Sequence, residues 1–358
     1  MGSPSISTRS STENRSARGI DMEAERNPMA AALTQTVLRH INGATGADGL
    51  KRLSGGASQE TWSFDATTEG QPIPLILRRA PGGERAPSAT AVPLETEAQL
   101  IGLAGAAGVP VPTVRHTLSA EDGLGHGFIM DRITGETIAR KILRDDEFAD
   151  ARPKLARQCG EILARLHSVD KKSLPPLRTS PARSEIDQYL GVYKTHGHPH
   201  PVFDLALRWL KENAAPETTA HTLVHGDFRH GNLMIGPDGI RAVLDWELAH
   251  IGDPMEDLGW ICVNSWRFGN IDLPVGGFGR REDMFEGYEA AGGAKVDPAR
   301  VKFWEVLGTL KWGIMCTIMV TAFKSGADRS VERATIGRRS SETEIDLLRL
   351  LAPRGKEA

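Results

Sequence analysis

The segment 225–245 constrains the fold of this chain more than any other part. It opens with the letters HGDFRHGN, in which Asp227 precedes Asn232 by five residues, and it closes on Asp245. Between Asn232 and Asp245, two apolar runs flank the turn sequence GPDG, a pattern that predicts a β-hairpin. The hairpin would carry Asn232 at one end and Asp245 at the other, so the two would meet across a rigid ladder.

These three side chains meet the needs of phosphoryl transfer. Kinase catalytic loops have an aspartate that faces the substrate hydroxyl, an asparagine five residues later that holds magnesium, and a downstream aspartate that also holds magnesium. Moving a γ-phosphoryl group calls for a base near the incoming hydroxyl and for oxygen ligands around a hard, octahedral cation. The spacing predicts Asp227 as the catalytic residue and Asn232 and Asp245 as magnesium ligands. Either fragment alone could be an ordinary polar turn; the ordered set favours the catalytic interpretation.

The same residues resemble the aminoglycoside phosphotransferase and choline kinase-like family of small-molecule kinases. The resemblance extends from about Ala30 over nearly the whole chain, and is carried by HGD at 225–227, GN at 231–232, DWE at 245–247, GDP at 252–254 and DL at 257–258. Glycine instead of arginine between the histidine and the aspartate separates this group from most protein kinases. The chain looks most similar to a branch of bacterial proteins of unassigned substrate and of domains fused to acyl-CoA dehydrogenases, through LRR at 77–79, HGDFR at 225–229 and KW at 311–312.

A protein of this family would have an α+β, bilobal, protein-kinase-like fold. Its small N-terminal lobe would be an antiparallel sheet with one key helix, and its larger C-terminal lobe would be mostly helical. Strand-like runs around a helical segment at 94–107 agree with the first lobe; these runs lie at 50–53, 61–64, 73–77 and 127–130. We expect a flexible tail at 1–28, a nucleotide-binding lobe at 29–132, and a catalytic and substrate lobe at 133–358.

In this family a loop between the first two strands covers the nucleotide phosphates. The corresponding stretch contains Gly55, Gly56 and Ser58, whose backbone N–H groups and hydroxyl could approach phosphate oxygens. A glycine pair in a hairpin is more often only a turn, so the loop alone is weak evidence. Met130 and Arg132 match the family's linker, whose backbone meets the adenine edge.

The third strand of a kinase fold should end in a cation that contacts the phosphates. Arg78 falls on the position where the family has lysine, and Glu97 best matches the helix glutamate that pairs with it, with Glu95 as a rival in the same turn. Arginine presents a wide, rigid fork where lysine is a compact point charge, so the phosphates would be held differently. The alternative for Arg78 is a solvated arginine at a strand end.

Composition excludes several other classes of protein. A net charge of -3 over 358 residues gives no basic stripe for nucleic acid. The three cysteines follow no pattern typical of a disulfide framework or a zinc site. The N-terminus lacks an apolar signal region, and charged residues interrupt the apolar stretch 301–323, which leaves it too short to cross a bilayer. We expect a cytoplasmic protein with neither a nucleic-acid nor a membrane partner; the sequence does not indicate its oligomeric state.

We interpret the chain as a magnesium-dependent phosphotransferase that uses ATP, or GTP in its place, and acts on a hydroxyl of a small molecule. The alternative is a kinase-fold protein that binds a nucleotide or metabolite without transfer, which only Arg78 supports. A kinase acting on proteins is disfavoured because Asp245 is followed by Trp-Glu with no A-P-E signature. Aromatic residues at 246, 260, 266 and 312 would suit a sugar, a lactone or an acyl-bearing alcohol, but would equally suit a core.

Overall fold

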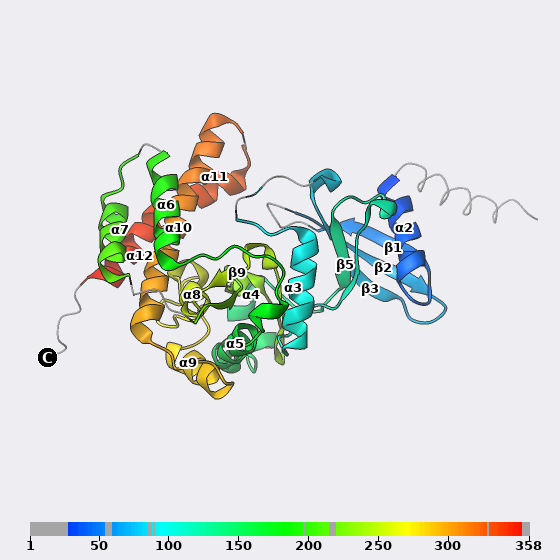
Figure 1. The fold of residues 1–358 in the computed structure, drawn as a ribbon, viewed down its shortest axis with the longest axis horizontal. Coiled ribbons are helices and arrows are strands. Elements are labelled where there is room, and N and C mark those ends of the chain that lie inside the picture. The colour runs from blue at the N-terminus through cyan, green and yellow to red at the C-terminus, as the bar shows by residue number, and fades with distance from the viewer. Residues whose placement is uncertain are drawn as a thin grey trace, which may run out of the picture. The chain divides into compact units, whose positions relative to one another are not determined.

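A computed structural model describes residues 28–53, 59–84, 88, 90–195, 198–214, 220–327 and 329–352. The chain divides into two compact units, residues 1–87 with 114–132 and residues 88–113 with 133–358 (Figure 1). The segment 88–113, which the sequence analysis assigns to the N-terminal lobe, thus groups with the second unit. Of the predicted tail, only Pro28 lies within the described residues.

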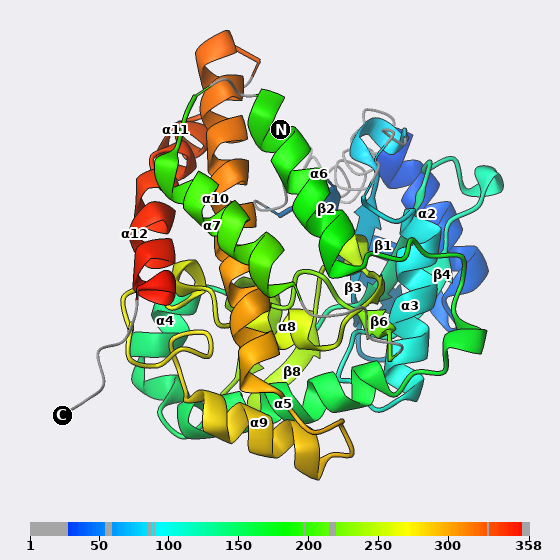
Figure 2. The same cartoon turned by 60° about the vertical axis from the view of Figure 1, so that its left-hand side comes forward.

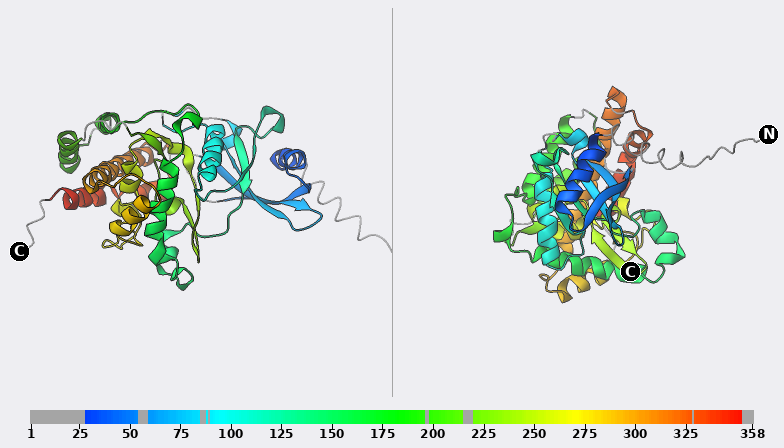
Figure 3. Two further views of the ribbon diagram at one scale, coloured as in Figure 1. Left: turned by 60° about the horizontal axis from the view of Figure 1, so that its bottom comes forward. Right: turned by 90° about the vertical axis from the view of Figure 1, so that its right-hand side faces the viewer.

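The first unit is a five-stranded antiparallel sheet with one helix against it. The helix α2 (Pro28–His40) lies over one face of the sheet (Figure 3). The sheet order is β1-β2-β3-β5-β4, and its strands are β1 (Ala44–Arg52), β2 (Glu60–Thr68), β3 (Ile73–Arg79), β4 (Val114–Thr117) and β5 (Gly127–Asp131). Leu33 and Val37 of α2 pack on inward-facing residues of the sheet such as Phe64 and Leu75. The four predicted strands are confirmed with wider bounds, whereas β4 is an additional edge strand.

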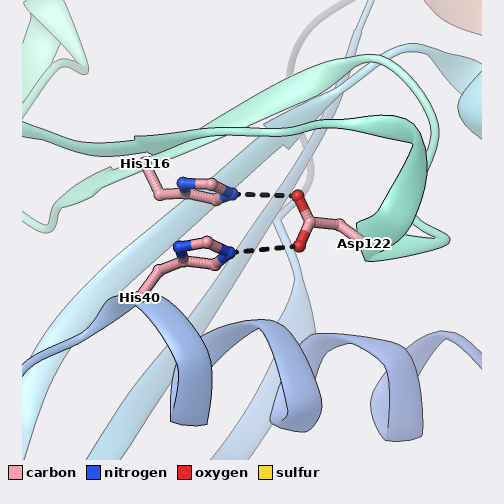
Figure 4. Close-up of side chains that lie close together, drawn as sticks. All are labelled: His40, His116 and Asp122. Carbon is pink, nitrogen blue, oxygen red and sulfur yellow. Dashed lines mark hydrogen bonds and ion pairs between the residues drawn. The ribbon is translucent and has the colours of Figure 1, made fainter.

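A buried carboxylate ties the end of α2 to the loop after β4. Asp122 accepts hydrogen bonds from His116 Nε2 at 2.9 Å, Arg39 Nη2 at 2.9 Å and the Ser119 amide at 2.8 Å. The rings of His40 and His116 are stacked at 3.7 Å with their Nε2 atoms toward this carboxylate (Figure 4). Burial alone would raise the pKa of Asp122, but the bonds from His116 and Ser119 lower it to about 2.

The latch formed by His40, His116 and Asp122 offers ligand atoms within 4.8 Å of one another, close enough for a metal ion. A cation there would face the guanidinium of Arg39, which already binds Asp122 Oδ1. Because the carboxylate is satisfied by protein donors, we interpret the three residues as a structural connection.

The second unit is mostly helical and contains two short antiparallel ladders, β6 with β9 and β7 with β8. Its elements are α3 (Leu94–Ala106), α4 (Ala139–Arg144), α5 (Arg152–His167), α6 (Ala182–Thr195), α7 (Pro201–Asn213), β6 (Thr222–Val224), β7 (Leu233–Gly236), β8 (Gly239–Val243), β9 (His250–Gly252), α8 (Met255–Trp260), α9 (Arg281–Ala290), α10 (Pro298–Ser325), α11 (Val331–Gly337) and α12 (Ser340–Leu351). Short 3₁₀ turns lie in both units, at Pro81–Gly83, Ala120–Asp122, Asp146–Phe148, Lys171–Ser173, His230–Asn232, Trp246–Leu248 and Asn264–Trp266. Together the two units have the α+β, kinase-like architecture that the resemblance implies.

The helix α10 is the centre of the second unit (Figure 2). It contacts α6, α7, α8, α11 and α12, and its first half is buried, including Glu305 and Lys311. By length and composition α10 could also cross a membrane, contrary to the expectation that the stretch is too short, and it is the one such helix among the described residues. Since other helices cover it and it buries two ionisable side chains, we interpret it as a core helix.

The latch at Asp122 makes the first unit sensitive to acid. Because the pKa of Asp122 is lowered from 3.8 to about 2, its contribution to stability is complete above the unfolded value and is lost as pH falls through that interval. We expect Asp122→Asn to cost about 1–3 kcal/mol near neutral pH, the usual cost of breaking hydrogen bonds to a buried charge. Thermal unfolding should show a lower melting temperature whose dependence on pH between 4 and 2 is reduced.

The control is Asp65→Asn, because Asp65 makes an exposed ion pair with Arg132 in the same unit. Exposed ion pairs contribute little to stability, so the free energy of unfolding of this variant should lie within about 0.5 kcal/mol of that of the parent protein. Equal melting curves for Asp122→Asn and Asp65→Asn would contradict the role given to the latch.

Candidate active site

The predicted hairpin is present and brings the two ends of the motif together. In the β7–β8 ladder Leu233 lies opposite Val243 and Gly236 opposite Gly239. One step beyond the ladder, the Leu244 amide donates to the Asn232 carbonyl at 2.9 Å. Asn232 and the residue before Asp245 are therefore joined by a backbone hydrogen bond.

Four contacts fix the carboxylate of Asp227. Asn232 Nδ2 donates to Oδ2 at 2.7 Å, and the indole N–H of Trp260 donates to Oδ1 at 2.8 Å. Arg229 Nε lies 3.1 and 3.2 Å from the two oxygens. Each carboxylate oxygen thus has two contacts, one of them to the shared Arg229 Nε, and together they set the plane of the group.

His225 connects Asp227 to the downstream aspartate. Its ring is buried, its Nδ1 accepts from the Asp227 amide at 3.2 Å, and its Nε2 lies 3.1 Å from the Leu244 carbonyl. Because a carbonyl can only accept, Nε2 must carry the proton, which leaves Nδ1 as the acceptor. Burial lowers the pKa of His225, so the ring stays neutral. The ring spans the loop that carries Asp227 and the turn that carries Asp245.

A second buried carboxylate anchors the start of the loop. Asp257 Oδ2 and Oδ1 accept from the amides of His225 at 2.9 Å and Gly226 at 3.0 Å, and Oδ2 also lies 3.2 Å from His167 Nε2. Burial would raise the pKa of Asp257, but the bonds from His167 and from the His225 amide hold it below its ordinary value. Asp257 therefore remains an ion that holds the loop backbone.

The backbone at Gly226 explains why the motif has glycine between the histidine and the aspartate. Its φ is +78°, in the left-handed region. A Cβ at this position would lie 2.5 Å from the Leu248 carbonyl oxygen, far inside contact distance. Both the conformation and the available space therefore demand glycine here.

Asp245 also has left-handed backbone, with φ of +68°, although it is not glycine. Non-glycine residues in this region carry strain of about 1–3 kcal/mol and cluster at functional sites. The next residue, Trp246, donates its amide to Glu97 Oε1 at 3.3 Å. Glu97 is 1% exposed and lies on α3. The helix glutamate thus lies beside the turn that carries Asp245, within the second unit.

The remaining predicted residues lie in the first unit. Arg78 is half-buried in β3, opposite Thr61 on one side and Phe128 on the other. Its neighbour Arg79 is committed to an ion pair with Glu60 at 2.9 Å. The pairing of Arg78 with Glu97 or Glu95 would join the two units, and it stays a prediction.

The predicted nucleotide contacts divide into described and undescribed residues. Met130 lies in β5 opposite Ile76, and Arg132 follows the strand with its amide bonded to the Pro74 carbonyl at 3.0 Å. The side chain of Arg132 binds Asp65 at 2.6 Å. The loop residues Gly55, Gly56 and Ser58 lie outside the described residues.

Two contacts of Asp227 were not predicted as such. Arg229 lies only two residues after Asp227, and its guanidinium also stacks 5.0 Å from the ring centre of Trp266. The sequence indicates Trp260 only as an aromatic residue of the core or of the acceptor site. A residue 33 positions downstream is brought to Asp227 by α8, and no local pattern in the sequence signals that contact.

The fixed backbone at Gly226 gives a sharp test of the loop. Gly226→Ala should destabilise the protein by about 1–3 kcal/mol, because alanine is strained at positive φ, and should displace the loop away from the Leu248 carbonyl. Calorimetric unfolding would measure the loss of stability, and nucleotide binding would report the displacement of the loop. The control is Gly191→Ala in α6, where a Cβ meets no atom within 4 Å and where alanine favours the helix. A Gly226→Ala protein as stable as Gly191→Ala would contradict this account.

Comparison with known proteins places these residues in a wider group. The model of the phosphotransferase enzyme family matches residues 49–301. Acyl-CoA dehydrogenase family member 10 from Mus musculus is 29% identical over 196 residues, which cover 53% of this chain and 18% of that protein. Family member 11 from Gallus gallus is 31% identical over 226 residues, 60% of this chain and 28% of that protein. The chain therefore spans only a minor part of these relatives' length.

Solved structures with low sequence identity share the fold. A candidate aminoglycoside phosphotransferase from Ralstonia eutropha has a TM-score of 0.69 at 22% identity, covering 89% of this chain and 97% of its own. A choline/ethanolamine kinase family protein from Mesorhizobium loti has a TM-score of 0.60 at 20% identity, covering 89% and 95%. A spectinomycin phosphotransferase bound to ADP and spectinomycin has a TM-score of 0.60 at 14% identity, covering 90% and 99%.

Proposed function

This chain belongs to the phosphotransferase enzyme family, and on that premise we propose that it is a small-molecule kinase that transfers the γ-phosphoryl group of ATP to a hydroxyl. GTP could replace ATP. The observation that carries the proposal is the single frame that holds the Asp227 carboxylate, Asn232 and the Asp245 turn, connected through His225 and Leu244. Such preorganised groups are what phosphoryl transfer requires of a protein.

In this proposal Asp227 orients the acceptor hydroxyl and accepts its proton as the oxygen attacks phosphorus in line. The donors from Trp260, Arg229 and Asn232 prevent the carboxylate from rotating. A base fixed in this way keeps the acceptor oxygen on the line of attack, which is the main contribution a kinase makes.

The oxygen atoms at the end of the hairpin fit a magnesium ion. Asn232 uses its Nδ2 for Asp227, while its Oδ1 makes no hydrogen bond within the described residues. The Asp245 carboxylate supplies the anionic ligand that magnesium prefers. Asn232 and Asp245 would hold the ion, which when bound neutralises phosphate charge. On the first unit, Arg78 would neutralise further phosphate oxygens, steadied by Glu97.

The alternative proposal is a kinase-fold protein that binds a nucleotide or metabolite without transfer. The arginine at position 78 supports it, whereas the three donors on Asp227 oppose it, because a binding protein needs no oriented base. The solved structures that share the fold include a spectinomycin phosphotransferase bound to ADP and spectinomycin, which supports the proposal of transfer to a small molecule. We propose a cytoplasmic enzyme with no nucleic-acid partner, in agreement with the net charge of -3.

The base gives the first test of function. Asp227→Asn keeps the shape of the side chain and removes its charge, so ATP and magnesium should still bind while transfer falls by about 10²–10⁴-fold. ADP release during a screen of hydroxylated metabolites would measure transfer, and calorimetry would measure binding. Asp238→Asn, in the exposed turn between β7 and β8, is the control and should keep full activity. Full activity of Asp227→Asn on the acceptor would overturn the proposed mechanism.

The proposed metal ligand Asp245 gives the second test of function. Magnesium should tighten ATP binding to the parent protein, and Asp245→Ala should lose that enhancement because the triphosphate charge is left uncompensated. Titration calorimetry with ATP, run on both proteins with magnesium and with EDTA, measures this enhancement in each. If both proteins bound ATP equally under both conditions, the assignment of Asp245 would be wrong.

A further inference from the structure

The proposed mechanism makes no use of Lys311, although this lysine is buried beside the site. It lies in the middle of α10 and is 8% exposed. Placing an ammonium group away from water is unfavourable unless its surroundings compensate, so a buried lysine in a core helix needs an explanation. Part of the compensation comes from two rings: Lys311 Nζ lies 4.9 Å from the ring centre of Trp260 and 5.7 Å from that of Tyr189.

The ionisable groups around Lys311 come from three elements. Glu185 and Tyr189 lie on α6, Glu256 on α8, and Asp227 on the loop before β7. Burial by itself lowers the pKa of a lysine, but Tyr189 and the neighbouring carboxylates raise that of Lys311 above its ordinary value. The ammonium group is therefore positively charged.

The ring that Lys311 covers is the one that binds Asp227. Trp260 donates its indole N–H to Asp227 Oδ1 at 2.8 Å. One turn before Lys311 on α10, Gly308 leaves room for this ring, since a Cβ there would lie 2.7 Å from Trp260 Cε3. Residues three apart on a helix share a face, so α10 presents a flat surface and a cation to the same indole.

We propose that Lys311 is a positioning residue of the phosphoryl-transfer site, and that it holds the Trp260 indole in the orientation in which its N–H bonds Asp227. The proposal deepens the function given above and rests on Asp227 being the base. A cation over the ring face attracts the π-electrons and increases the positive charge at the ring edge, where the N–H donates. Without it, the ring would lose one of the contacts that orient it, and its N–H would be a weaker donor to Asp227 Oδ1.

The spectroscopic test needs no acceptor. The chain has seven tryptophans, so protein labelled with ¹⁵N-tryptophan should give seven indole signals, and Trp260→Phe identifies the one from Trp260. We expect this signal at low field in the parent protein. In Lys311→Met it should move upfield and exchange with solvent faster by at least about tenfold, while the other six signals report that the protein is folded. Lys311→Arg should restore the parent signal.

A matched control lies on the same helix. Lys302 Nζ stacks 5.8 Å from the ring centre of Trp209, far along α10 from Lys311. Lys302→Met removes the same kind of contact, so it should leave the Trp260 signal and ATP turnover unchanged. An unmoved Trp260 signal in Lys311→Met, or an equal shift in Lys302→Met, would overturn the proposal. If Lys311→Met fails to fold, Lys311→Arg provides the test. A folded Lys311→Arg protein in which the Trp260 signal no longer lies at low field would also overturn the proposal.

Turnover provides the second measurement. With Mg·ATP and water as the acceptor, ADP release by Lys311→Met should have a kcat about 10- to 30-fold lower, the size expected for one desolvated cation–π contact, with KM for ATP within about twofold. A packing defect would change both kcat and KM or neither of them, and either result would contradict a positioning role for Lys311. If the parent protein released no ADP with any acceptor, the proposed function would fail, and the indole signal would still decide the role of Lys311.

Discussion

The buried carboxylate of Asp257 is the interaction on which the site depends. An ion in the interior is tolerated only when donors surround it, and Asp257 meets this condition through the amides of His225 and Gly226 and the His167 ring. The relation also works in the other direction. Loop amides that turn inward need an acceptor, and removing it would leave two buried N–H groups unpaired. The loop that presents Asp227 and the first turn of α8 therefore form as one structure.

From this anchor the site is built by short connections. The His225 ring bonds the Leu244 carbonyl, and the Leu244 amide bonds the Asn232 carbonyl at the end of the hairpin. Two residues with left-handed backbone, Gly226 and Asp245, lie at the two ends of this arrangement. The first is relieved by the absence of a side chain, and the second keeps its strain, which the surrounding hydrogen bonds must offset. The frame thus stores its conformational cost at the residue proposed to bind the metal.

Local features of the sequence were sufficient to predict the frame, whereas the contacts made over long distances were not. The GPDG turn and the spacing of Asp227, Asn232 and Asp245 are local, and the hairpin formed as predicted. The roles of Trp260 and Lys311 depend on how α8 and α10 pack, which no periodicity reveals. Several elements were also not predicted, among them β4, a strand of four residues, and the charged helices α11 and α12. Their identity depends on neighbours more than on propensity.

The grouping of 88–113 with the second unit has a consequence for chain topology. The polypeptide passes between the units three times, at 87/88, 113/114 and 132/133, so neither unit is a continuous piece of sequence. Three hydrogen bonds join residues 88–113 to the hairpin and the turn after it. The Val92 amide donates to the Glu247 carbonyl, the Trp246 amide donates to Glu97 Oε1, and the Val243 amide donates to the Pro110 carbonyl. A protein that began at residue 133 would therefore lack residues 88–113 and the hydrogen bonds that they make. The second unit can be produced as a separate protein only together with residues 88–113, which lie within the sequence of the first unit.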